Sequence, residues 1–166
     1  MITKDHLLNS LLRECTICLH LIDKVRPEHL SYRPTPGQRS IEELLRYMSY
    51  CVVSALDGMS TGDWKGFAAC RERANARPVT ELRTMMEEQL DGIRAFFAAA
   101  GEEAMVSQEV KVPGGGTLPL AAAIMDGPLK WITAYKMQLF LYLKSAGVEN
   151  LGTTNVWGGF DKPANA

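Results

Sequence analysis

The segment from Trp131 to Gly147 constrains the fold more than any other part of this chain. Its apolar run and its terminal glycine are typical of a long helix that ends at Gly147. Trp131 and Tyr135 are four residues apart, so on a helix their side chains lie one above the other on one face. Helices use this spacing to present two ligands to one metal ion, but an indole and a phenol are poor ligands for a divalent metal.

Three further segments have the apolar spacing of amphipathic helices: residues 5–25, 41–56 and 80–100. Ser40 and Glu43 form a capping box at the start of the second segment, which predicts that a helix begins at the next residue. Thr80 is the expected N-cap of the third helix, and Gly101 stands where a C-cap glycine belongs.

The fourth helix is expected to begin after Thr117, with Leu118 and Pro119 as its first residues, and to run to Ala146. Pro128 removes one backbone hydrogen bond, so a kink or a break is expected at that residue.

The segments between these helices have weaker signals. Residues 27–37 contain three prolines and predict an irregular connector. Residues 57–77 predict a loop or a short helix anchored by Trp64 and Phe67. Residues 109–116 predict a small hairpin or an extended loop that turns at its glycines.

Four amphipathic helices with long second and third connections predict an all-α fold, a four-helix bundle. We expect one bundle domain over residues 1–147 and a C-terminal tail over residues 148–166. The tail is polar and rich in glycine, with one apolar cluster at Val156, Trp157 and Phe160 that is expected to pack on the bundle.

Composition limits the function classes. The apolar fraction of 46% and charged fraction of 22% are those of a globular protein, and a net charge of −1 favours neither nucleic acid nor an anionic membrane as partner. No apolar run reaches the roughly 18 residues that span a bilayer, and the N-terminus has no signal-peptide pattern, so a cytoplasmic location is expected. The cysteines at positions 15, 18, 51 and 70 are then expected to be reduced thiols.

Two parts of the chain resemble the DinB-like family of four-helix bundles. In the last helix, Lys136, Gln138 and Gly147 match the family pattern His-x-x-x-His-Arg-Gly-Gln and the apolar run after it. The segment 33–46 is similar to the Pro-rich connector and Ser-Ile cap that lead into the family's second helix. With the order of the elements between them, the resemblance covers most of residues 1–147.

The resemblance implies a divalent metal held by three histidines, one on the second helix and two on the last. The corresponding positions here are Tyr47, Trp131 and Tyr135, so we expect no metal and no other cofactor. Family members include thiol-dependent transferases and isomerases, whose chemistry needs the metal to lower the pKa of a bound water or thiol. A chain that lacks the metal ligands can still retain the pocket in which the family holds its metal.

Other candidate ligands lie elsewhere. His6 and His20 fall on one helical stripe and are expected to face solvent, and His29 lies in the connector. Cys15 and Cys18 form a C-x-x-C pattern on the apolar stripe of the first helix, which predicts buried core residues and not a metal or redox site.

These observations favour binding of a small molecule, or a non-catalytic role, at an aromatic pocket formed by Tyr47, Trp131, Tyr135 and Gln138. The same side chains could instead form a structural core stripe with hydrogen-bonded phenol groups. One alternative function is a thiol-dependent transferase or isomerase-like enzyme that works without the metal, with a tyrosine phenol as acid. Another is a structural module that dimerises through apolar helix faces, and a homodimer is expected. Whether the chain is an enzyme stays open, and no catalytic residue is assigned.

Overall fold

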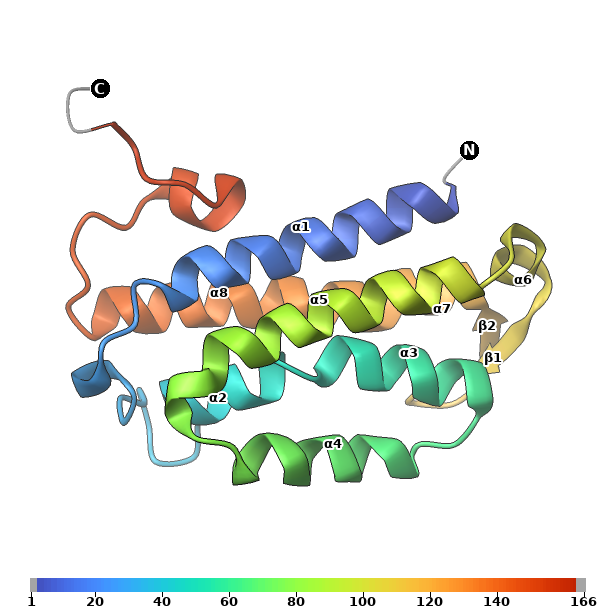
Figure 1. The fold of residues 1–166 in the computed structure, drawn as a ribbon, viewed down its shortest axis with the longest axis horizontal. Coiled ribbons are helices and arrows are strands. Elements are labelled where there is room, and N and C mark those ends of the chain that lie inside the picture. Colours follow the sequence, from blue (N-terminus) through green and yellow to red (C-terminus); the bar gives the residue numbers. More distant parts are fainter. Residues whose placement is uncertain (1–2, 164–166) are drawn as a thin grey trace.

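Four helical segments run side by side along the long axis of the molecule in the computed structural model, which describes residues 3–163 (Figure 1). They are α1 (Lys4–Ile22), α2 with α3 (Ile41–Met48 and Cys51–Thr61), α5 (Leu82–Ala99), and α7 with α8 (Leu120–Ile124 and Lys130–Ser145). The first segment contacts α5 and α8, while α3 contacts α5 and α2 contacts α8. The predicted all-α four-helix bundle is therefore confirmed.

The first two helices begin as their capping residues require. Thr3 accepts a hydrogen bond from the backbone of His6, and the His6 ring accepts one from the Thr3 backbone. In the same way, Ser40 Oγ accepts from the Glu43 backbone at 3.2 Å, and Glu43 Oε2 accepts from the Ser40 backbone at 2.7 Å. The capping box predicted at Ser40 is thus present, and it fixes the chain that enters α2.

The second helix is not continuous, in contrast to the expectation for residues 41–56. It breaks after Met48, and α3 begins again at Cys51. The buried side chain of Gln89 from α5 spans the break: its Nε2 donates to the Met48 carbonyl at 2.7 Å, and its Oε1 accepts from the Val52 backbone at 2.9 Å. This amide supplies partners to the backbone groups that a break leaves open.

Residues 57–77 are more helical than expected. The third helix continues to Thr61 and ends at Gly62, which has a left-handed φ of 74°. A 12-residue helix, α4 (Lys65–Ala76), comes next and lies outside the bundle against α2 and α3 (Figure 1). Trp64 lies against Gly58, where a Cβ atom would be 2.9 Å from the indole ring, so the close approach requires glycine.

The ends of the third bundle helix differ from the prediction. A 3₁₀ turn (Val79–Glu81) precedes α5, so Thr80 lies within that turn and does not cap the helix. Gly101 is not a left-handed C-cap. Its backbone is extended, with φ −71° and ψ 152°, and it is the N-cap residue of α6 (Glu102–Ser107).

The fourth helix starts later than predicted. A hairpin of β1 (Glu109–Lys111) and β2 (Thr117–Pro119) precedes it, with Lys111 opposite Thr117 in antiparallel register. Thr117, Leu118 and Pro119 therefore belong to a strand, because they pair with β1, and α7 begins at Leu120. Pro128 lies in a π-helical turn (Met125–Leu129) that joins α7 to α8.

The segment after α8 returns along α1. Its π turn (Thr154–Gly158) contacts α1 and α8 (Figure 1). At the other end of the chain, a 3₁₀ turn (Pro27–His29) lies in the connector between α1 and α2. The side chain of His20 is 15% exposed, with its Nε2 lying 3.0 Å from the Asn155 amide nitrogen and 3.7 Å from Asp161 Oδ1. The expectation that His20 faces solvent is wrong, because this segment covers it.

The core lies between the four bundle helices. Its largest fully buried side chains include Leu11, Leu44, Met86, Ile93 and Phe97. Within residues 3–163, no helix combines the length and the apolar character that crossing a membrane requires.

Candidate ligand pocket

Two of the predicted pocket residues, Tyr47 and Tyr135, meet between α2 and α8. Their ring centroids are 4.9 Å apart in an edge-to-face arrangement, with 68° between the planes. The Tyr47 ring also lies 5.6 Å from Tyr50 and 6.3 Å from Phe67 of α4. These four residues form what we call the aromatic cluster, to which α2, α4 and α8 each contribute a ring.

Arg39 lies over this cluster from the connector before α2. Its guanidinium carbon is 4.5 Å from the centroid of the Tyr47 ring and 5.8 Å from that of Tyr135. A guanidinium stacked on an aromatic face keeps the N–H groups at its edge available to an acceptor. The capping box at Ser40, the next residue, fixes the backbone from which Arg39 extends.

Trp131 and Gln138 lie elsewhere on α8. Trp131 is half-buried, and within the described part of the chain its ring forms no stacked pair with the aromatic cluster. Gln138 donates a hydrogen bond to the Tyr142 hydroxyl at 2.5 Å, one turn further along the helix. The structure thus brings together two of the four predicted residues and leaves the other two outside the cluster.

A pocket of about 370 Å³ opens beside the aromatic cluster, between the connector before α2 and the last turns of α4. We call it the arginine pocket. Its charged and aromatic lining consists of Arg33, Arg39, Arg71, Glu43, Tyr47 and Tyr50. Of the four predicted residues, Tyr47 lines this pocket, whereas Tyr135, Trp131 and Gln138 do not.

The arginine pocket has an excess of positive charge. Arg33 pairs with Glu43 at 3.1 Å. A hydrogen bond from the Ser40 backbone and the nearby Arg33 charge together hold the pKa of Glu43 below its usual value. The side chains of Arg39 and Arg71 form no ion pair and no hydrogen bond with another residue between 3 and 163, so their charges are uncompensated within the described structure.

The phenols of the pocket are neutral at ordinary pH. Burial raises the pKa of Tyr47 well above its usual value, and Cys51 and Tyr135 raise it further. Burial also raises the pKa of Tyr50, while the charges of Arg71 and Arg39 oppose that rise. A phenol with a raised pKa is a weak proton donor at neutral pH and a weak metal ligand, because metals bind the deprotonated form.

These side chains do not fit the divalent metal ion that the family resemblance implies. The raised pKa of Tyr47 keeps its phenol protonated, and the Trp131 indole nitrogen is a donor without a free lone pair. The Arg39 guanidinium stands over both phenol rings and would repel a cation. Among residues 3–163, no three His, Cys, Asp or Glu side chains are grouped so that they could hold a metal.

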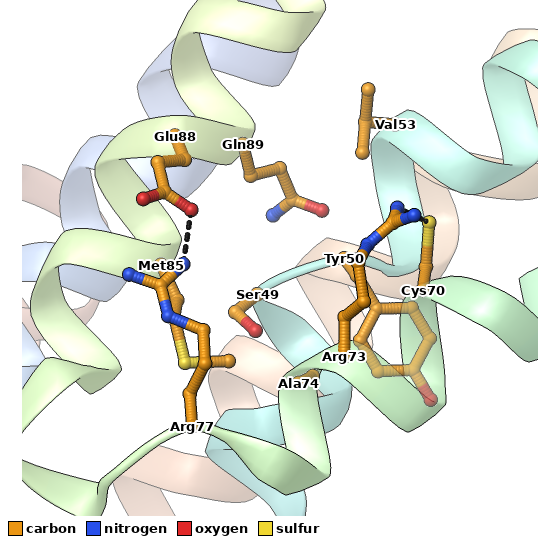
Figure 2. A pocket seen from close by; sticks show the side chains of 10 residues that line it. All are labelled: Ser49, Tyr50, Val53, Cys70, Arg73, Ala74, Arg77, Met85, Glu88 and Gln89. Carbon is orange, nitrogen blue, oxygen red and sulfur yellow. Dashed lines mark hydrogen bonds and ion pairs between the residues drawn. The ribbon is translucent and has the colours of Figure 1, made fainter.

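A second pocket, of about 270 Å³, lies between α4 and α5, and Tyr50 lines both pockets (Figure 2). Its arginines have partners. Arg77 pairs with Glu88, as Figure 2 shows, and Arg73 Nη2 lies 2.9 Å from Cys70 Sγ. This pocket therefore offers less free positive charge than the arginine pocket.

A buried ion pair that the sequence analysis missed joins α1 to α8. Lys136 has no exposed surface, and its Nζ lies 2.7 Å from Oε2 of Glu14, whose side chain is 16% exposed. Trp157 from the C-terminal segment covers the pair, with its ring centroid 4.7 Å from the lysine nitrogen. Lys136 matched the basic residue of the family pattern, but a pattern of residue types carries no information about burial.

Three of the four cysteines are core residues. Cys15, Cys18 and Cys51 are fully buried, while Cys70 is half-buried, and all four are free thiols. Burial raises the pKa of Cys15 to about 12 and that of Cys18 well above its usual value. The prediction that Cys15 and Cys18 are buried core residues is confirmed, and neither thiol is poised for reaction.

Comparison with known proteins identifies a solved structure that has the same fold. Neither a family model nor a curated protein sequence matches the chain. A crystal structure of a DinB-like protein from Bacillus subtilis superposes on it with a TM-score of 0.68, over 88% of this chain and 95% of that chain, at 19% sequence identity. Because function resides in sites and not in folds, so low an identity carries no activity across. This chain has the DinB-like four-helix-bundle fold.

Proposed function

We propose that this chain binds a small molecule in the arginine pocket beside the aromatic cluster, without the family metal. The observation that carries the proposal is the position of Arg39, whose guanidinium carbon lies near the Tyr47 and Tyr135 rings and which lines a pocket of about 370 Å³. Small-molecule sites are commonly concave, partly aromatic and furnished with a few convergent polar groups.

The proposal changes the set of residues expected from the sequence. Tyr47 lines the pocket that takes the ligand, and Tyr135 packs against the Tyr47 ring. Arg39, which was not among the residues expected from the sequence, lines this pocket, while Trp131 and Gln138 do not. The last two are therefore assigned to helix packing.

Binding accounts for the site better than the alternative of a metal-independent transferase. The raised pKa of Tyr47 weakens it as a general acid. Among the residues that line the arginine pocket there is no cysteine, serine or histidine that could act as a nucleophile or base. The side chains that line the pocket can therefore hold and orient a molecule, but none of them is a suitable nucleophile or base for group transfer.

A fragment screen read by thermal shift tests the proposal, because a ligand that binds only the folded state raises the melting temperature. Two substitutions locate the hits. Asn75→Trp places an indole at the rim of the arginine pocket, and Ala76→Trp places the same group on the next exposed residue of α4, outside the lining. Hits should lose their stabilisation in the first variant and keep it in the second. Hits that survive Asn75→Trp, or a screen without hits, would reject the proposal.

A further inference from the structure

We infer that the ligand of the arginine pocket is an organic anion whose carboxylate or phosphate group binds between Arg39 and Arg71. The inference rests on the proposed function and adds the chemical class of the ligand. It depends on which cations around the pocket have partners and which do not.

Arg39 is held in place without being neutralised. Its guanidinium carbon lies 4.5 Å from the Tyr47 ring centroid and 5.8 Å from that of Tyr135, so the two rings restrict its position, while no acidic side chain of residues 3–163 pairs with it. A guanidinium that is already ordered loses less conformational entropy when it binds a carboxylate or phosphate. The aromatic cluster therefore prepares Arg39 for an anionic partner.

Arg71 approaches the same space from α4. It lines the arginine pocket, is exposed, and makes no ion pair with another described residue. Arg71, Arg39 and Tyr50 all line this pocket, and both charges oppose the effect of burial on the pKa of Tyr50. Two cations that face one pocket from different elements repel each other, and an anion between them removes that repulsion.

The other arginines around the two pockets are already paired. Arg33 binds Glu43, Arg77 binds Glu81 and Glu88, and Arg73 lies against Cys70. An anion that competed for these groups would have to displace a carboxylate or a thiol. Arg39 and Arg71 can accept it without breaking a side-chain hydrogen bond or ion pair of the described structure.

The rest of the lining indicates what the anion is attached to. Tyr47 and Tyr50 supply an aromatic wall, and Asn75 adds a side-chain amide. A planar apolar body would lie against the rings while its acidic group reaches the two guanidinium groups. Benzoate and phenyl phosphate each combine a planar aromatic ring with an acidic group. Benzamide is a neutral analogue of benzoate.

The test measures binding of benzoate, phenyl phosphate, inorganic phosphate and benzamide to the full chain by titration calorimetry. Arg39→Gln and Arg71→Gln remove one charge each, and Arg73→Gln removes a charge from the same helix on the side of the second pocket. Each of the first two should weaken binding of the aromatic anions by about tenfold or more, as expected for charged hydrogen bonds, whereas Arg73→Gln should change it by less than about threefold. Arg39→Lys, which keeps the charge but loses the planar fork, should give an intermediate loss.

The possible results separate this inference from the proposed function. Tighter binding of benzoate or of phenyl phosphate identifies the acidic group as a carboxylate or a phosphate, and either result supports the inference. If benzamide binds as tightly as benzoate and Asn75→Trp abolishes both, the ligand class is wrong but the pocket stands. If anion binding depends on Arg73 and not on Arg39 or Arg71, the inference is overturned. If no probe is affected by Asn75→Trp, both the inference and the proposed function fail.

Discussion

Breaking the buried ion pair between Lys136 and Glu14 should destabilise the fold, and removing both charges together should not. Glu14→Leu would leave the lysine charge with no exposed surface and no carboxylate partner, with the Trp157 ring centroid 4.7 Å from its nitrogen. Loss of one partner from a buried pair costs about 3–5 kcal/mol, and full burial of Lys136 places this variant at the upper end. The cation–π contact offsets only about 1–2 kcal/mol of the cost.

Lys136→Met should cost less than Glu14→Leu. The carboxylate that it leaves behind is 16% exposed and can recover part of its hydration, so we expect a loss of about 2–3 kcal/mol. The double variant replaces both charges with apolar groups of similar volume and should be within about 1 kcal/mol of the original protein. The two substitutions are therefore strongly coupled, by at least about 3 kcal/mol.

Urea unfolding of the four proteins, monitored by far-ultraviolet circular dichroism, measures each free energy and checks that the slope is unchanged. An additive double variant, as unstable as the sum of its parts, would refute the reasoning, since it would mean that the two side chains stabilise the fold separately. A reversed order of the single variants would show that the lysine and not the glutamate has access to water.

Other predictions rest on single features of the structure. Gln89→Leu should cost about 2–4 kcal/mol in the same assay, because it leaves two backbone groups unpaired at the α2–α3 break; a loss below about 1 kcal/mol would contradict this. Trp131→Ala should cost only about 1–2 kcal/mol, since the ring is half-buried, and a larger loss would place the ring in the core. Thiol labelling of the native protein should modify Cys70 first and the three buried cysteines only on unfolding. Burial raises the pKa of Cys15 from 9.0 to about 12, so the unfolded thiol loses its proton before the folded one. The free energy of unfolding should then be intact below pH 9 and fall above it, by up to about 1.4 kcal/mol per pH unit for this thiol; a flat profile would contradict its burial.

The bundle was predictable from the sequence because its signals are local. The helical spacing of apolar residues and the capping box at Ser40 each act within a few residues of where they are found. The break in the second helix was not predictable, because its partner Gln89 lies 37 and 41 residues away from the groups that it bonds. Likewise the sequence left open whether residues 57–77 form a loop or a short helix, because only Ala74 of α4 is buried and the helix has no apolar stripe.

The candidate site was predictable only in part. The resemblance of the chain to a known family indicated that Tyr47 and Tyr135 would meet, although four-residue spacing alone could not show that Trp131 points elsewhere. Arg39 could have been found from its place beside a helix cap, but Arg71 lies in a segment that was not recognised as a regular helix. The expected homodimer, the cytoplasmic location and the exclusion of nucleic acid stay predictions, because each concerns molecules outside a single chain.

The π turn at residues 125–129 changes how this chain can be aligned with other bundles. A turn with hydrogen bonds five residues apart holds one more residue than an α-helical turn, so α8 is rotated by about 100° relative to an uninterrupted continuation of α7. Counting residues from Leu120 would therefore assign the wrong face to all of α8, including Tyr135. An alignment between this chain and another bundle must allow a one-residue offset between Ile124 and Lys130.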